Sequence, residues 1–363
     1  MKKDNLKTIF LIWVLFILVV SLSSYIFFTQ GSLRFDVRYF YSLANWDGSY
    51  FLEIAKNGYI NKNHFAFFPL YPLLIGLISK LTHLNVLFIG ILINLLSLIG
   101  SLVLLKKLLL IDYPRKITEE TITYLLIFPT SFYILTIYSE SLFLFLSLGA
   151  FYFTRRFLKK QKLKYLALGI LFVIFASATR LVGAALVIAL WLEFLQKNKD
   201  IKTKLKWLIL FMPAGLITYL IFLYSQTGSA TYFLTSQQNW QRGLTVPVLS
   251  IWQSIEGIIN NQIGSIRLTL LYELLFTIFG IGIVIRSFRF LRTSYSVYAL
   301  ISILLPLFTS TLMSMPRFLS VIFPIFLTLA LIKNQRVKVF YIIISVLLLS
   351  LNLGLFINGF WVS

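Results

Sequence analysis

The chain has 363 residues, of which 59% are hydrophobic and only 12% are charged, and its formal net charge is +21. Charged residues make up about a quarter of an ordinary soluble domain, so this composition excludes a soluble globular protein. The chain contains no cysteine, which excludes disulfide bonds.

Repeated apolar runs of about 20 residues predict an all-α, polytopic membrane protein with roughly 10–12 transmembrane or partial helices. No run alternates as a barrel strand would. The first run, 6–28, follows Met1-Lys2-Lys3 and resembles a signal peptide, but it is too long and no small-residue cleavage site follows it. We therefore expect a retained first span within a single transmembrane domain, 1–363. The candidate spans are 6–28, 65–82, 84–105, 121–137, 140–154, 165–179, 181–195, 207–224, 266–285, 295–312, 318–332 and 339–358.

The basic residues lie mainly in short loops between the apolar runs. The positive-inside rule places such loops in the cytoplasm. This distribution indicates a protein of the lipid bilayer and not a nucleic-acid-binding protein. The expected cytoplasmic segments are the N-terminal tail and loops 106–120, 155–164, 196–206, 286–292 and 333–338.

Segment 65–82 departs from this topology. If the chain starts in the cytoplasm, loop 29–64 is external, and two complete spans after it would make the basic loop 106–120 external too. Pro69 and Pro72 disfavour a continuous helix, because proline costs a helix interior about 3 kcal/mol or more. We therefore predict that 65–82 is a partial or re-entrant helix.

Two polar segments are expected on the external side. In the first external loop, 29–64, apolar residues following Trp46 recur at helical spacing opposite Glu53 and Lys56, which predicts one or two short interfacial helices. The second external loop, 225–265, is rich in Gln, Asn, Ser and Thr. We expect it to form a loop or lid.

Four ionisable residues outside the basic loops are candidates for chemistry. By the topology above, Asp47 lies in the first external loop, and Glu140, Arg180 and Arg317 each fall at the external end of a span. Charged groups at membrane depth are expensive and usually mark a substrate path. Carboxylates and guanidinium groups on one side of the membrane suit a general base together with anion-binding arginines.

Each candidate also has a purely structural interpretation. Asp47 could be a solvated acid beside the interfacial anchor Trp46, and Glu140 could be a helix N-terminal residue stabilised by the helix dipole. Arg180 and Arg317 could be snorkelling side chains, but the positive-inside rule disfavours that role on the external side.

Metal and cofactor sites have little support in the sequence. The two histidines, His64 and His83, have no partner at ligand spacing. The chain has no Walker loop, no dinucleotide fingerprint and no Asp-x-Asp pair. We expect no cofactor and assign no metal-binding residue, while the metal dependence of the reaction is left open. Trp46 and His64, both in the first external loop, are counted with the candidate substrate-binding residues.

Several motifs resemble those of the PIG-V family, the second mannosyltransferases of GPI-anchor synthesis. The most specific are NWDGSYFLEIAKNGY at 45–59 and AFFPLYPL at 66–73. Three more follow in the same order: FPT at 128–130 leading to YSESLF at 138–143, ATR at 178–180 and SMPRF at 314–318. Together these motifs cover less than half of the chain.

The resemblance implies a membrane glycosyltransferase of the GT-C superfamily. Such enzymes take a sugar, typically mannose, from a polyprenyl phosphate such as dolichyl phosphate and invert the anomeric centre. The resemblance also implies that Asp47 is the general base. Arg180 and Arg317 would hold the donor phosphate, and Glu140 would orient the acceptor or an arginine; these three roles come from the topology.

The acceptor is left open. The short chain, rich in Lys, Ile and Phe, is typical of a prokaryotic protein, so a glycolipid, a cell-wall glycan or a protein would fit, with the active site on the extracytoplasmic face of the cell membrane. A transporter or flippase of a lipid-linked saccharide is the alternative, but it would more often show two matching halves with interrupted helices. An acyltransferase or phosphotransferase is disfavoured because no nucleophile with a paired histidine is visible.

Overall fold

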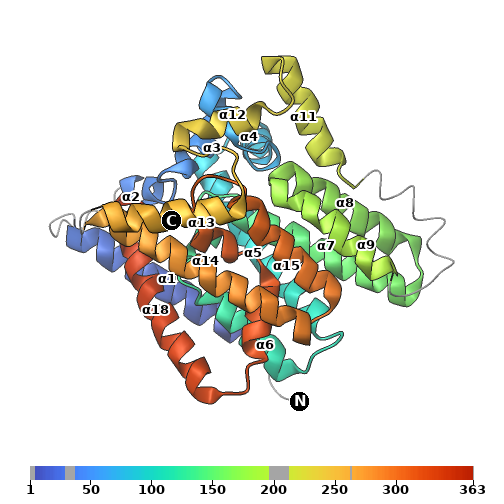
Figure 1. Ribbon diagram of the computed structural model, residues 1–363. Coiled ribbons are helices and arrows are strands. Elements are labelled where there is room, and N and C mark those ends of the chain that lie inside the picture. Colours follow the sequence, from blue (N-terminus) through green and yellow to red (C-terminus); the bar gives the residue numbers. More distant parts are fainter. Residues whose placement is uncertain (1–4, 29–36, 196–211, 262–263, 363) are drawn as a thin grey trace.

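A computed structural model describes residues 5–28, 37–195, 212–261 and 264–362 (Figure 1). In these residues every regular element is a helix, with one isolated bridge between Leu244 and Thr309 and no strand. The expected all-α fold class is confirmed. The α-helices are α1 Leu6–Phe28, α2 Val37–Ser42, α3 Asp47–Asn57, α4 Leu70–Thr82, α5 Val86–Leu109, α6 Arg115–Leu126, α7 Glu140–Lys160, α8 Leu163–Thr179, α9 Ala185–Leu195, α11 Ala214–Thr227, α12 Tyr232–Ser236, α13 Pro247–Asn260, α14 Ser265–Phe290, α15 Thr293–Leu307, α16 Met315–Leu319, α17 Phe323–Ala330 and α18 Gln335–Ile357. The 3-10 helices are η1 Lys62–Ala66, η2 Ser131–Ile134, η3 Leu181–Ala184 and η4 Gln237–Trp240.

Five of the described helices are long and apolar enough to cross a membrane, namely α1, α5, α7, α14 and α18. Helices α1 and α18, from opposite ends of the sequence, pack along each other (Figure 1). Helix α7 packs between α5 and α8 and is largely buried within the protein. This arrangement confirms a polytopic helical membrane protein.

Two predicted spans are interrupted in the structure. The prediction of one span over 121–137 is wrong, because α6 ends at Leu126 and an irregular turn at Phe128-Pro129-Thr130 leads into η2. Likewise, 318–332 is divided between α16 and α17. Irregular backbone at membrane depth is tolerated where protein surrounds it. Thr130 Oγ1 connects the first interruption to α16 by donating to the carbonyl of Pro316 at 2.8 Å.

Segment 65–82 behaves as predicted for a partial helix. Its first residues belong to η1, and α4 begins only at Leu70. The 13 residues of α4 span about 20 Å at 1.5 Å per residue, which is shorter than the roughly 30 Å hydrocarbon core.

The second external loop is more ordered than predicted. Residues 225–265 contain α12, η4 and the amphipathic helix α13. Helix α12 packs on η1, and Ser236 Oγ donates to the carbonyl of Lys62 at 2.9 Å. The two segments predicted to be external therefore meet in the structure. The predicted cytoplasmic loop 196–206, the first part of span 207–224 and the first part of loop 29–64 lie outside the described residues.

A charge network joins several of the predicted cytoplasmic loops. Glu193 of α9 accepts hydrogen bonds from Arg292 at 2.9 and 3.1 Å and from Ser294 at 2.5 Å. Arg155 of α7 forms a bidentate pair with Asp112 at 2.7 and 2.9 Å and lies 3.8 Å from Glu193. Loops 106–120, 155–164 and 286–292 thus gather at one end of the bundle, as their common basic character predicts.

Candidate active site

Asp47 is the first residue of α3, where a carboxylate interacts favourably with the helix dipole. The preceding residue, Trp46, has a φ of 60°, a conformation that costs energy for a bulky side chain. The next residue is glycine because the backbone is crowded there: a Cβ on Gly48 would lie 3.1 Å from the carbonyl oxygen of Ile137. The Trp-Asp-Gly sequence therefore turns the chain sharply and starts α3 against the segment before α7.

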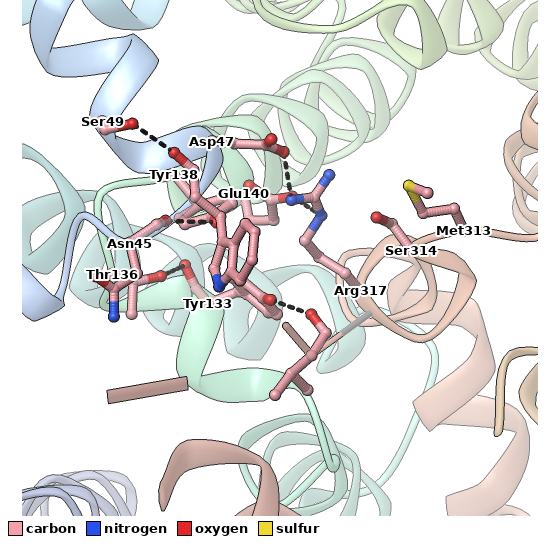
Figure 2. Close-up of polar contacts among 12 residues, drawn as sticks. Asn45, Asp47, Ser49, Tyr133, Thr136, Tyr138, Glu140, Met313, Ser314 and Arg317 are labelled. Carbon is pink, nitrogen blue, oxygen red and sulfur yellow. Dashed lines mark hydrogen bonds and ion pairs between the residues drawn. The ribbon is translucent and has the colours of Figure 1, made fainter. Parts of the chain in front are cut away.

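Glu140 also begins a helix. It is the first residue of α7 and is buried. The segment before it is anchored on the Asp47 turn, since Tyr138 Oη donates to the carbonyl of Asn45 at 2.9 Å (Figure 2). A backbone hydrogen bond of 2.9 Å from Ile137 to Leu43 makes a second connection. These contacts hold the two acidic helix N-termini beside each other.

The two predicted arginines come from other segments of the chain. Arg180 directly follows α8 in an extended conformation. Arg317 lies in the short helix α16, which Ser314 precedes with a φ of 69°. Arg180 lies just after a helix and Arg317 lies in a single short turn of helix, and both side chains line one cavity within the bundle.

The four side chains form a continuous ion-pair ladder, Asp47–Arg317–Glu140–Arg180. Arg317 Nη1 lies 2.7 Å from Asp47 Oδ2, and Arg317 Nε lies 3.4 Å from Glu140 Oε1 (Figure 2). Arg180 Nη1 lies 2.6 Å from the same Glu140 oxygen. Exposure of the four side chains ranges from 2% for Glu140 to 15% for Arg180. The predicted convergence of these residues is therefore present in the structure.

Aromatic rings surround the guanidinium groups of the ladder. The Arg317 guanidinium lies over the rings of Tyr133 and Tyr138, 5.5 and 5.2 Å from their centroids. The centroid of the Phe318 ring lies 5.4 Å from the guanidinium carbon of Arg317 and 5.2 Å from that of Arg180. At these distances the negative ring faces attract the cations, which helps to keep both arginines charged at a position removed from bulk water.

The ladder lines a cavity of about 420 Å³. All four of its residues border this space, together with the second external loop, which contributes Gln237 and Trp240. Most of the remaining wall is apolar. The apolar lining includes Phe51, Phe67, Phe68, Phe143, Leu181, Val182, Phe233, Leu234, Leu244, Leu305, Phe308, Met313, Phe318, Val321 and Ile322. The cavity is therefore charged at the ladder and mainly apolar elsewhere.

A third arginine, Arg242, also lines this cavity and was not among the predicted site residues. Its guanidinium lies 5.6 Å from the Phe318 ring, and its Nη2 donates to the carbonyl of Met313 at 2.7 Å. Burial, and then the charge of Arg317, lower the pKa of Arg242 to about 10, so the group is still a cation at neutral pH. The only available sequence signal was an arginine close to Trp240 in a polar external segment.

Trp46 and His64, the other predicted substrate-binding residues, do not line the cavity. Trp46 is exposed, donates from Nε1 to the carbonyl of Phe360 at 3.2 Å and lies edge-on to Trp361, a lining residue. His64 is buried, with Nε2 3.2 Å from a carboxylate oxygen of Glu53. Both are placed to support the site from outside, and their binding role stays a prediction.

No group of three or more His, Asp or Glu side chains suited to a metal ion occurs among the described residues. Within the cavity the two carboxylates are already engaged by arginines. The metal dependence of the reaction therefore stays open, as in the sequence analysis.

Comparison with known families gives this cavity its context. The mannosyltransferase (PIG-V) family matches residues 33–243, which is more than half of the chain. The chain belongs to this family. The match confirms the predicted resemblance and covers all of the motifs that carried it except SMPRF at 314–318. It includes Asp47, Glu140, Arg180 and Arg242, whereas Arg317 lies outside it.

Individual relatives match shorter parts of the chain. The GPI alpha-1,6-mannosyltransferase 2 of mouse is 34% identical over 121 residues, which cover 30% of this chain and 24% of the mouse protein. The rat protein of the same name is 32% identical over 120 residues, with the same coverage. GPI mannosyltransferase 2 of Drosophila pseudoobscura pseudoobscura is 47% identical over 38 residues, covering 10% of this chain and 8% of the fly protein. The matches thus span about a quarter or less of each relative, and no solved structure matches the chain.

Proposed function

We propose that this membrane protein transfers mannose from a polyprenyl-phosphate donor to a glycolipid or glycan acceptor, on the extracytoplasmic face of the cell membrane, with Asp47 as general base. One observation carries the proposal: in a chain of the PIG-V mannosyltransferase family, Asp47 lies on the wall of a largely apolar cavity beside paired arginines. The mouse and rat relatives are GPI alpha-1,6-mannosyltransferases, which supports mannose as the sugar.

The cavity is chemically complementary to the proposed donor. A polyprenyl-phosphate sugar combines an anionic phosphate with a long hydrocarbon chain and a polar sugar. The arginines at the ladder suit the phosphate, because charge-assisted hydrogen bonds to phosphate are among the strongest in proteins. The apolar walls suit the first isoprene units, and Trp240 and Gln237 offer a stacking face and an amide to the sugar.

The proposed reaction is a single displacement. Asp47 takes the proton from an acceptor hydroxyl, and the acceptor oxygen forms a bond to the anomeric carbon. The bond between that carbon and the phosphate oxygen breaks, and polyprenyl phosphate leaves with the electron pair. Attack opposite the leaving group inverts the anomeric centre, so a β-linked donor gives an α-linked product.

The geometry around Asp47 is compatible with this role. Its Oδ2 is engaged by Arg317, while its Oδ1 has no hydrogen-bond partner in the part of the chain that the structure describes. One oxygen thus fixes the carboxylate, and the other is left to accept a proton. General-base assistance of this kind contributes about 10²–10⁴-fold to a rate. The arginines would supply electrostatic stabilisation of the leaving phosphate in addition.

A transfer assay tests the proposal and separates it from lipid transport. Purified protein is mixed with a short-chain polyprenyl phosphate carrying labelled β-mannose and with a mixture of glycolipid and glycan acceptors. We expect labelled α-mannosyl product together with released polyprenyl phosphate. If no acceptor is labelled, while the protein moves the intact lipid-linked sugar across a vesicle membrane, the protein is a transporter and the proposal fails.

A further inference from the structure

The charges that line the cavity do not balance. Asp47 and Glu140 contribute two negative charges, and Arg180, Arg242 and Arg317 contribute three positive ones. Arg317 is paired with both carboxylates and Arg180 is paired with Glu140. No carboxylate of the described residues forms an ion pair with Arg242, although Asp47 and Glu273 both act on it from beyond ion-pair distance. The excess positive charge is therefore located at Arg242.

The hydrogen bonds of Arg242 are also incomplete. A guanidinium carries five N–H donors, and the contact to the Met313 carbonyl uses one of them. Its Nε is buried and has no acceptor among the described residues. A buried donor without a partner costs free energy, so a bound acceptor would relieve this cost. A bound anion would neutralise the excess positive charge and would also accept a hydrogen bond from the buried Nε–H.

The ring of Phe318 lies near both Arg242 and the two arginines of the ladder. The centroid of its ring lies within 6 Å of the central carbon of all three guanidinium groups. The distances are 5.2 Å for Arg180, 5.4 Å for Arg317 and 5.6 Å for Arg242. All three arginines line the same cavity as Asp47, and the charges of Arg317 and Arg180 act on Arg242. An anion bound at Arg242 would therefore share the cavity with the proposed general base.

We infer that Arg242 is the primary phosphate-binding residue of the donor site, and that Arg180 and Arg317 are engaged mainly in positioning the two carboxylates. This inference rests on the proposed function for the identity of the ligand, a polyprenyl phosphate. It assigns the phosphate to a residue of the second external loop, so donor binding also fixes that loop over the cavity. The predicted assignment of the phosphate to Arg180 and Arg317 would then be secondary.

A binding cycle that varies the protein and the ligand charge together tests this inference. A short-chain polyprenyl phosphate and the polyprenol of the same length are titrated into the wild-type protein and the Arg242→Gln variant. The uncharged alcohol reports the apolar part of the cavity, and the ratio of the two dissociation constants isolates the phosphate. Arg267→Gln is the matched control, because Arg267 lies at the start of α14 and does not line the cavity. Inorganic phosphate in a third titration shows whether the anion is recognised without its lipid.

For the wild-type protein and Arg267→Gln we expect the phosphate to bind at least about tenfold more tightly than the alcohol. Arg242→Gln should lose most of this preference while its affinity for polyprenol stays the same, and Arg242→Lys should recover part of it. An unchanged preference in Arg242→Gln overturns the inference, and this includes the case in which both affinities fall by the same factor while thermal unfolding shows that the variant is folded.

The outcome is separable from that of the transfer assay. If wild-type protein transfers mannose and Arg242→Gln keeps its phosphate preference, the proposed function stands and this inference fails. If the wild-type protein transfers no mannose but Arg242 carries the phosphate preference, the anion site is real and the reaction assigned to it is wrong.

Discussion

The Asp47→Asn variant should lose mannose transfer by about 10²–10⁴-fold, the contribution expected of a general base. An amide keeps the size and shape of the side chain but cannot accept the acceptor proton. Arg317 would retain its contact with Glu140, so the arginine is not left unpaired and the fold should persist. The measurement is the initial rate of transfer from a saturating donor, with thermal unfolding in detergent as the test of folding.

Glu53→Gln is the matched control for this variant. Glu53 lies on the same short helix, α3, but contacts His64 and does not line the cavity. The Glu53→Gln variant should transfer mannose at close to the wild-type rate. A rate for Asp47→Asn within tenfold of wild type would show that Asp47 is not the base. The affinity of Asp47→Asn for the donor should change little, because the proposed role of Asp47 is to take a proton from the acceptor.

The Arg317→Gln variant should lose both stability and activity. Arg317 is the only described cation that contacts both Asp47 and Glu140, and its side chain is 8% exposed. Removing one partner of a buried ion pair leaves an uncompensated charge and costs about 3–5 kcal/mol. The expected result is a clear fall in Tm together with loss of transfer.

A double variant separates these two effects. In Asp47→Asn/Arg317→Gln both partners of the 2.7 Å pair become neutral amides, while Glu140 keeps its ion pair with Arg180. We expect much of the lost Tm to return and transfer to remain absent. If Arg317→Gln alone is as stable as wild type, the ladder does not hold the site together. A double variant less stable than either single one would contradict the coupling between Asp47 and Arg317.

Much of the fold follows from the apolar runs, because each long run has only one way to satisfy its backbone in lipid. The boundaries of α1 and α18 agree closely with the predicted spans 6–28 and 339–358. The interrupted segments could not be placed in this way. Hydropathy does not distinguish a helix from a buried turn, and the breaks before η2 and between α16 and α17 depend on tertiary contacts such as that between Thr130 and Pro316.

The site was partly visible in the sequence for an electrostatic reason. Asp47, Glu140, Arg180 and Arg317 stand out because charge is rare and costly near the apolar spans, and the positive-inside rule places them on one side. Which arginine pairs with which acid depends on side-chain geometry and was not predictable. Arg242 was not selected because it lies in a polar loop, where an arginine carries no such cost, and its closeness to Trp240 is only a weak signal.

The most direct test of the account is a structure of the protein with a donor analogue whose bond from sugar to phosphate cannot be cleaved. The account predicts that the phosphate binds beside Arg242 within the cavity, that the isoprene units contact its apolar wall, and that Asp47 Oδ1 faces the anomeric carbon from the side opposite the phosphate, with room for an acceptor hydroxyl between them. An analogue bound outside this cavity, or a sugar held with its anomeric carbon turned away from Asp47, would contradict it.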